Sequence, residues 1–305
     1  MRESQSYGDV PVRRDVHSGG VSAARSARMQ RASDLCDGEG VPAVTAEGIA
    51  LSAAEGRVFG SLSFTVPGRG LTVLCGRGGS GRTSLALSLS GRMKLDAGSL
   101  TVLGERHPSK INKMVAVAGV EAIDGLDGDV RLKTILTEHK AWSRPWIWWT
   151  KPADQDYYES VCGEVFGDLP RPPLGAYVAE LNSLDNILIR ISLALAPAHS
   201  QEIRMLVMDD LEQVREYDLR LALIGVLSRL AERMPVVVNT VNPLPDSLVP
   251  EHTLIELCTT DTSTEADATL STTAVVGDRP GDGAPGYEIR RGNAVVAGPD
   301  EETQS

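Results

Sequence analysis

Short apolar runs, separated by polar and glycine-rich segments, recur along the middle of the chain. One of them, Leu71–Cys75, lies between two glycines and has the length and composition of a buried strand. The other predicted strands are 62–66, 100–103, 205–208 and 235–238. Between the last two, apolar residues recur at helical spacing: Leu223, Ile224, Leu227, Leu230 and Met234. Strands that alternate with helices indicate parallel βαβ units and an α/β fold.

The two ends of the chain lack this periodicity. Residues 1–40 are rich in Arg, Ser, Gly and Asp, which predicts a flexible leader. Residues 259–305 hold nine acidic residues against three arginines and many Thr, Ser, Gly and Pro, which predicts an acidic low-complexity tail. The predicted globular domain is therefore 41–258.

Composition excludes several classes of function. A net charge of −11 argues against nonspecific nucleic-acid binding, which needs a basic surface. The four cysteines and five histidines are widely spaced, so we expect neither a zinc site nor a disulfide framework, and a cytoplasmic location follows. We also expect no membrane span and no signal peptide, because no apolar run is long enough. A role at a membrane would need a partner.

The clearest chemical signal follows the strand at Leu71–Cys75. Residues 76–83 read Gly-Arg-Gly-Gly-Ser-Gly-Arg-Thr, close to the G-x-x-x-x-G-K-[ST] pattern of a phosphate-binding loop, with arginine in place of lysine. A strand, a glycine loop and a helix N-terminus together form an anion site. We predict a nucleotide site here; the alternative is a glycine-rich turn that binds nothing. The predicted binding residues are Gly76, Gly78, Gly79, Ser80, Gly81, Arg82, Thr83 and Ser84.

Residues on both sides of the loop narrow the choice of fold. Segments 91–98 and 99–104 resemble the region after the phosphate loop in ATP-binding cassette (ABC) ATPases, where a helix end, a turn and a strand that closes at glycine follow. The hairpin at 59–70 resembles the strand pair before that loop. The resemblance covers about 41–257 and implies an α/β P-loop NTPase of the ABC-ATPase type. It also implies a mixed sheet with an inserted helical subdomain at about 122–196.

The resemblance assigns roles to several residues. Thr83 matches the hydroxyl that binds Mg²⁺, and Asp209 matches the carboxylate that holds the water shell of the metal. Asp210 stands where the family has a catalytic glutamate. Its oxygens would lie about 1.5 Å further back, and a displacement of that size can cost about 100-fold in rate, so we expect slow hydrolysis. The alternative is an acid pair that faces solvent.

Arg82 has two interpretations. Its guanidinium can bind phosphate in bidentate fashion, although it is wider than the ammonium of lysine. If the loop binds nothing, the side chain points to solvent instead.

The signature segment Leu-Ser-Gly-Gly-Gln of the family corresponds to 181–185, Leu-Asn-Ser-Leu-Asp. Both glycines are missing, and Asp185 would bring negative charge toward a negative ligand. Asn182 or Ser183 can still cap the next helix, so a plain capped core helix is the alternative.

Three further family positions are not retained. An aromatic that stacks on adenine would fall near Ala54 or Glu55, while Phe59 is expected in the core. The family glutamine would fall near Val120 and the late histidine near Val241; the substitutes available for the histidine are Asn239 and Asn242.

All four tryptophans lie in 142–149, in the region that faces the membrane partner in the family. Tryptophan is enriched at interface centres, but these rings can equally pack inside the helical subdomain. Near the end of the chain, 293–297 resembles the last strand of such cassettes. It would pair with 253–257 and leave 259–287 as an inserted loop; an unstructured tail is the alternative.

The function implied is the ATP-binding subunit of an ABC-type transport system. It would bind Mg·ATP, with Asp210 as a weak catalytic base, and couple slow hydrolysis to a separate transmembrane, permease-like protein. A second cassette, identical or different, would complete the site, and the protein would lie at the inner face of the plasma membrane. The alternative is a nucleotide-sensing or scaffold module without hydrolysis.

Overall fold

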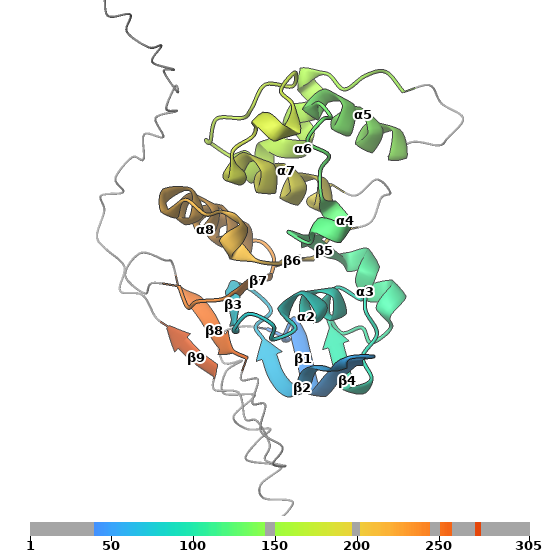
Figure 1. Cartoon of the computed structure of the whole chain (residues 1–305), viewed down its shortest axis with the longest axis vertical. Coiled ribbons are helices and arrows are strands. Elements are labelled where there is room, and N and C mark those ends of the chain that lie inside the picture. Colours follow the sequence, from blue (N-terminus) through green and yellow to red (C-terminus); the bar gives the residue numbers. More distant parts are fainter. Residues whose placement is uncertain (1–39, 144–149, 197–201, 245–250, 258–271, 276–305) are drawn as a thin grey trace, which may run out of the picture.

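The computed structural model describes residues 40–143, 150–196, 202–244, 251–257 and 272–275 (Figure 1). The chain folds into two sheets with helices on both faces of the larger one. The strands are β1 (Val44–Ala53), β2 (Gly56–Val66), β3 (Leu71–Cys75), β4 (Ala97–Val102), β5 (Val115–Ala118), β6 (Met205–Met208), β7 (Val236–Thr240), β8 (His252–Glu256) and β9 (Thr272–Val275).

The helices fall into two groups along the chain. Two lie between β3 and β5: α2 (Arg82–Leu89) and α3 (Pro108–Met114). The rest follow β5: α4 (Glu121–Asp124), α5 (Leu132–Trp142), α6 (Gln155–Phe166), α7 (Ser183–Leu195) and α8 (Tyr217–Ala231), with 3₁₀ turns η1 (Val178–Glu180) and η2 (Leu211–Gln213). None of the described helices is both long and apolar enough to cross a membrane.

The larger sheet has the strand order β5-β6-β7-β3-β8-β9. Its first five strands are parallel, and β9 runs antiparallel to β8. Parallel strands that are covered on both faces read as continuous apolar runs, and β3 and β6 are buried at every position. The carboxyl ends of β6, β7 and β3 therefore lie next to one another, and the segments that follow them meet at one edge of the sheet.

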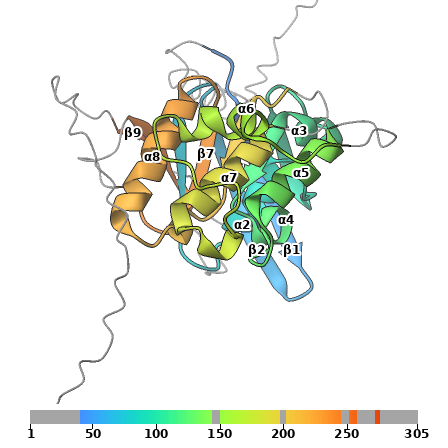
Figure 2. The ribbon, with the colours of Figure 1, turned by 90° about the horizontal axis from the view of Figure 1, so that it is seen from above.

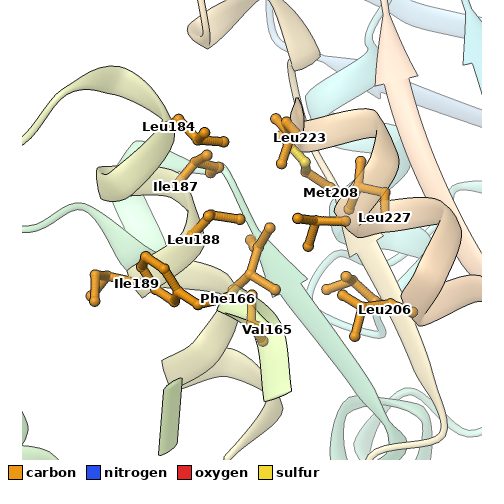
Figure 3. Close-up of a cluster of buried hydrophobic side chains, with 14 of the residues drawn as sticks. Val165, Phe166, Leu184, Ile187, Leu188, Ile189, Leu206, Met208, Leu223 and Leu227 are labelled. Atoms are coloured by element: carbon orange, nitrogen blue, oxygen red, sulfur yellow. The ribbon is translucent and has the colours of Figure 1, made fainter. Parts of the chain in front are cut away.

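Alternate residues of these strands enter two separate hydrophobic cores. Leu206 and Met208 of β6 face α6, α7 and α8, with which they form the first core (Figure 3). Met205 and Val207 face the other way, toward α2, α3 and the three-stranded antiparallel sheet of order β2-β1-β4. The molecule is thus layered as helices, large sheet, helices and small sheet (Figure 1), and α5 to α8 form the outer helical layer (Figure 2).

The predicted α/β class and mixed sheet are confirmed, because parallel and antiparallel strands coexist with helices on both faces. The predicted strand at Leu71–Cys75 coincides with β3, and 205–208 coincides with β6. The predicted apolar stripe lies in α8, although Met234 follows the end of that helix. The sequence interpretation did not identify β1 or β5.

The expected loop at 259–287 is wrong in part, because β9 lies within it and pairs with β8. The edge of β8 that does not pair with β3 has backbone N–H and carbonyl groups open to pairing, and these pair with β9. Residues 293–297, the leader 1–39 and the last three tryptophans lie outside the described residues. Trp142 ends α5 and is 72% exposed.

Candidate nucleotide site

The phosphate-loop motif lies where the pattern predicts, between the buried strand β3 and the helix α2. The N–H group of Gly76 donates to the carbonyl of Thr240 at 3.0 Å, which ties the start of the loop to β7. Gly81 has a φ of 72° and ends the loop immediately before α2. A Cβ atom at this position would lie 2.8 Å from the carbonyl oxygen of Val58, so a side chain is excluded by both conformation and space.

The predicted binding residues lie together at the phosphate loop and the start of α2. Gly76, Gly78, Gly79, Ser80 and Gly81 form the loop, and Arg82, Thr83 and Ser84 form the first turn of α2. The first N–H groups of a helix have no partner within the helix, and the helix dipole places partial positive charge beside them. No acidic residue lies in the first turn of α2 to oppose an anion.

The guanidinium of Arg82 turns back over the loop and does not point away from it. Its Nη1 donates to the carbonyl oxygen of Gly76 at 2.8 Å. A guanidinium carries five N–H donors, so this bond leaves donors for a phosphate. The interpretation in which Arg82 points to solvent is therefore wrong.

The two predicted metal residues contact each other. The hydroxyl of Thr83 donates to Oδ2 of Asp209 at 2.6 Å, and Asp209 is buried at the end of β6. The amide of Asn239 donates to the other carboxylate oxygen, Oδ1, at 2.8 Å. Asp209 is not a solvent-facing strand-end acid, and that alternative is wrong for it.

The residues present fit a Mg²⁺–nucleotide complex. A hydroxyl that donates its hydrogen keeps lone pairs that can bind a cation, and the Thr83 hydroxyl beside a carboxylate is the oxygen donor set that Mg²⁺ prefers. Two buried polar atoms beside the loop, Oγ of Ser80 and Oδ1 of Asn239, have no hydrogen-bond partner within the described residues. These two atoms are therefore available to a ligand or a water molecule at the loop.

Asp210, the predicted base, occupies an unusual position. It is one of two non-glycine residues with positive φ in the described chain (φ 54°). Burial raises the pKa of its carboxyl, and the adjacent Glu212 raises that pKa further. A raised pKa makes the Asp210 carboxylate a stronger base and also raises the pH below which it is protonated.

Glu212 was not identified from the sequence. Its Oε1 accepts from the hydroxyl of Thr240 at 2.7 Å and from the N–H group of Val241 at 2.8 Å. Burial would raise the pKa of Glu212, but these bonds outweigh it and lower the pKa. Glu212 thus holds the segment after β7, where the family histidine would stand, and Asn242 also donates its N–H group to it at 3.4 Å.

The signature position begins a capped helix, as predicted. The side chain of Asn182 accepts from the N–H group of Asp185 at 2.7 Å and caps α7. The carboxylate of Asp185 accepts from Nδ2 of Asn182 at 3.0 Å and is buried. Its carboxylate is therefore hydrogen-bonded within the cap, and the expected repulsion of a ligand held by a second cassette stays a prediction. Phe59 lies in the core as expected.

A buried polar network that the sequence did not predict connects α7 to the site. Arg190 of α7 is 4% exposed and binds both carboxylate oxygens of Asp124, at 2.6 and 3.0 Å. Its Nη1 donates to Gln213 at 3.0 Å, and Gln213 in turn donates to the backbone carbonyls of Gly119 and Asp209. The helical layer is thus connected to the residue at the end of β6.

The comparisons place this arrangement among known folds. Neither a protein-family profile nor a curated protein matches the sequence. Solved structures do match. A metal-chelate type ABC transporter in an inward-facing conformation is 15% identical, with a TM-score of 0.55, over 77% of this chain and 84% of that chain. CbiO1 from Clostridium perfringens, part of the ABC transporter complex CbiONQ, is 10% identical, with a TM-score of 0.52, over 70% and 85%.

A nucleotide-free ATP-binding cassette from an ABC transporter is 14% identical, with a TM-score of 0.52, over 71% of this chain and 88% of that chain. At these identities the likeness concerns the fold. The chain has the P-loop fold of the ATP-binding cassettes of ABC transporters, as the resemblance in its sequence predicted.

Proposed function

We propose that this chain, which has the fold of an ATP-binding cassette, is the Mg·ATP-binding subunit of an ABC-type transport system. One observation carries the proposal. The phosphate loop between β3 and α2 ends at the Thr83 hydroxyl, which contacts the buried carboxylate of Asp209 at 2.6 Å. Loop, hydroxyl and carboxylate are the three parts that a P-loop site needs to hold a nucleotide and its metal.

Different residues of the loop and of its surroundings would bind the phosphates and the metal. The N–H groups of Gly78, Gly79, Gly81, Arg82 and Thr83 would donate to the phosphate oxygens, whereas that of Ser80 donates to the carbonyl oxygen of Arg77 at 3.1 Å. Arg82 would add the positive charge that lysine supplies elsewhere. Thr83 and Asp209 would hold Mg²⁺, directly and through its water shell. When bound, Mg²⁺ supplies charge that neutralises the phosphate oxygens.

Slow hydrolysis is the expected activity of this site. Asp210 is one methylene shorter than the glutamate it replaces, and it has positive φ. The chain therefore keeps the parts that bind nucleotide better than the part that would activate water.

The membrane partner would contact the junction of the helical layer and the large sheet. A cleft of about 430 Å³ opens there, lined by Arg92, Asn112, Ile123, Arg190 and Leu193 among others. Ile123 is 48% exposed, and a large apolar side chain exposed beside a cleft is typical of a protein contact surface. We place the protein at the inner face of the plasma membrane through this partner, with a second cassette, identical or different, completing the site.

A titration with a fluorescent ATP analogue, with and without Mg²⁺, tests the binding step. The intact chain should bind, and Arg82→Ala should weaken binding by about tenfold, because it removes a charge-assisted contact with the phosphates. Equal binding by the variant would exclude Arg82 from the site.

Phosphate release tests the turnover step. Asp210→Asn should reduce it by about 100-fold, the size of a typical general-base contribution. Unchanged release would show that Asp210 is not the base.

The second candidate function, a nucleotide-sensing module without hydrolysis, rests on the altered Asp210 and signature segment. Arg82→Lys separates the two, since a gain in turnover supports a weak ATPase and no change supports the sensor.

A further inference from the structure

Asn239 is an unusual residue for its position. It lies in β7 directly after Val236, Val237 and Val238, opposite Leu74 of β3, and its side chain is fully buried. Burying an amide costs free energy unless hydrogen bonds compensate. An apolar residue would pack better in a central parallel strand. Packing therefore does not explain why an amide stands at this position.

The hydrogen bonds of this amide all lead to the nucleotide site. Nδ2 donates to Oδ1 of Asp209 at 2.8 Å and to the carbonyl oxygen of Arg82 at 2.9 Å. Thr83 donates to Oδ2 of Asp209 at 2.6 Å. The carboxylate is therefore held from both sides, by β7 through Asn239 and by α2 through Thr83, and the same amide fixes the first residue of α2.

We propose that Asn239 is a positioning residue for the metal: it orients the Asp209 carboxylate and so determines how much Mg²⁺ strengthens nucleotide binding. The proposal rests on the proposed function, because it needs a nucleotide at the loop. Groups that hydrogen-bond a metal-holding carboxylate fix its orientation, and their loss typically costs about 10- to 100-fold in metal affinity.

A purely architectural role for Asn239 makes a different prediction. If the amide only links β7 to β6 and α2, its removal lowers stability and weakens nucleotide binding equally with and without Mg²⁺. A positioning role mainly affects the binding that depends on Mg²⁺, because the Asp209 carboxylate acts through the metal. The lost bond to the Arg82 carbonyl should weaken metal-free binding by a smaller factor.

The experiment measures the Kd of the full chain for an ATP analogue in excess Mg²⁺ and in EDTA, together with the melting temperature. Asn239→Leu removes both donated bonds at similar volume, and Asn239→Ser does so with a smaller side chain if the first variant does not melt cooperatively. Thr72→Val is the matched control. Thr72 is equally buried in the neighbouring strand β3, and its hydroxyl has no partner within the described residues, so the change loses no bond.

The relevant ratio is the Kd in EDTA divided by the Kd in excess Mg²⁺, which measures how much Mg²⁺ strengthens binding. We expect Thr72→Val to keep the ratio found for the unmodified chain. In the Asn239 variants the ratio should fall by about 10-fold or more, with the EDTA value changed less than about threefold. An unchanged ratio in a folded Asn239 variant, or an equal loss with and without Mg²⁺, overturns the proposal. Absence of any binding by the unmodified chain would instead contradict the proposed function itself.

Discussion

Gly81 controls the geometry of the phosphate loop. Its φ of 72° lies in the left-handed region, and its α-carbon faces the carbonyl of Val58 on the strand β2. Gly78, three residues earlier in the same loop, has no atom within 4 Å of an added Cβ and does not have positive φ. The two glycines therefore form a matched pair: alanine at position 81 would strain the backbone and clash with β2, whereas alanine at position 78 would do neither.

Gly81→Ala should destabilise the protein by about 1–3 kcal/mol and abolish nucleotide binding, because the start of α2 must move away from Val58. Gly78→Ala should change the free energy of unfolding by less than about 0.5 kcal/mol. Urea denaturation and nucleotide titration of both variants measure these effects. Equal behaviour of the two variants would contradict the role given to Gly81.

The loop residues could be predicted individually because the motif is contiguous. Thr83 and Asp209 could be paired because the resemblance relates them across 125 intervening residues, and the structure brings them to 2.6 Å. The bond between Asn239 and Asp209 could not be predicted. It depends on β7 lying beside β6, and that neighbour relation is set by the order of strands in the sheet, which no local pattern records.

The helix α7 is tied to the rest of the molecule by a buried polar network. Arg190 on this helix is buried against Asp124, which follows β5, and contacts Gln213 in η2. Removing one partner of a buried ion pair leaves the other charge uncompensated, which costs far more than losing an exposed pair. The buried Arg190 of α7 therefore helps to fix how the helical layer sits on the sheet.

Arg190→Met should lower the free energy of unfolding by about 3 kcal/mol, because Asp124, whose side chain is only 14% exposed, loses its cation. The double variant Arg190→Met/Asp124→Leu should recover part of that loss, because the N–H group of Gly119 and Oε1 of Gln213 also lose their partners. Arg233→Ala is the control, since its ion pair with Glu164 is exposed and should contribute less than about 1 kcal/mol. Urea unfolding measures all three, and an equal loss in Arg233→Ala would contradict the difference we derive from burial.

The continuous apolar runs of β3 and β6 were predicted, but the equally buried run of β5, four residues of Val and Ala, was missed, as was β1 with its mixed composition. The runs of β3 and β6 are apolar because helices or a second sheet cover both faces. The strand β1 alternates buried and exposed residues and contains an irregular register with β2, which hides its period. The strand β9 lies in a segment rich in threonine that we interpreted as a loop.

In the whole molecule, the large sheet belongs to two hydrophobic cores at once. Adjacent residues of β6 enter different cores: Met205 packs with α2, α3 and the small sheet, and Leu206 packs with the helical layer. Because β3, β5, β6 and β7 contribute to both cores in this way, neither core can unfold without exposing residues of the shared strands.

Met205→Ala and Leu206→Ala should each destabilise the protein by about 2–5 kcal/mol, the cost of a cavity in a core. We expect both variants to lower the temperature of the same single calorimetric transition. Two transitions, of which each variant shifts only one, would show that the layers on either side of the sheet unfold independently.

Nucleotide binding by the intact chain remains the most direct measurement. Titration of ATP with Mg²⁺ into the full-length protein in a calorimeter should give a saturable heat with one site per chain, since the loop at Gly76–Thr83, the Arg82 guanidinium and the Thr83–Asp209 pair are assembled in one site. Gly81→Ala should abolish this heat. No heat from the unmodified chain at millimolar ATP would contradict the proposed nucleotide site.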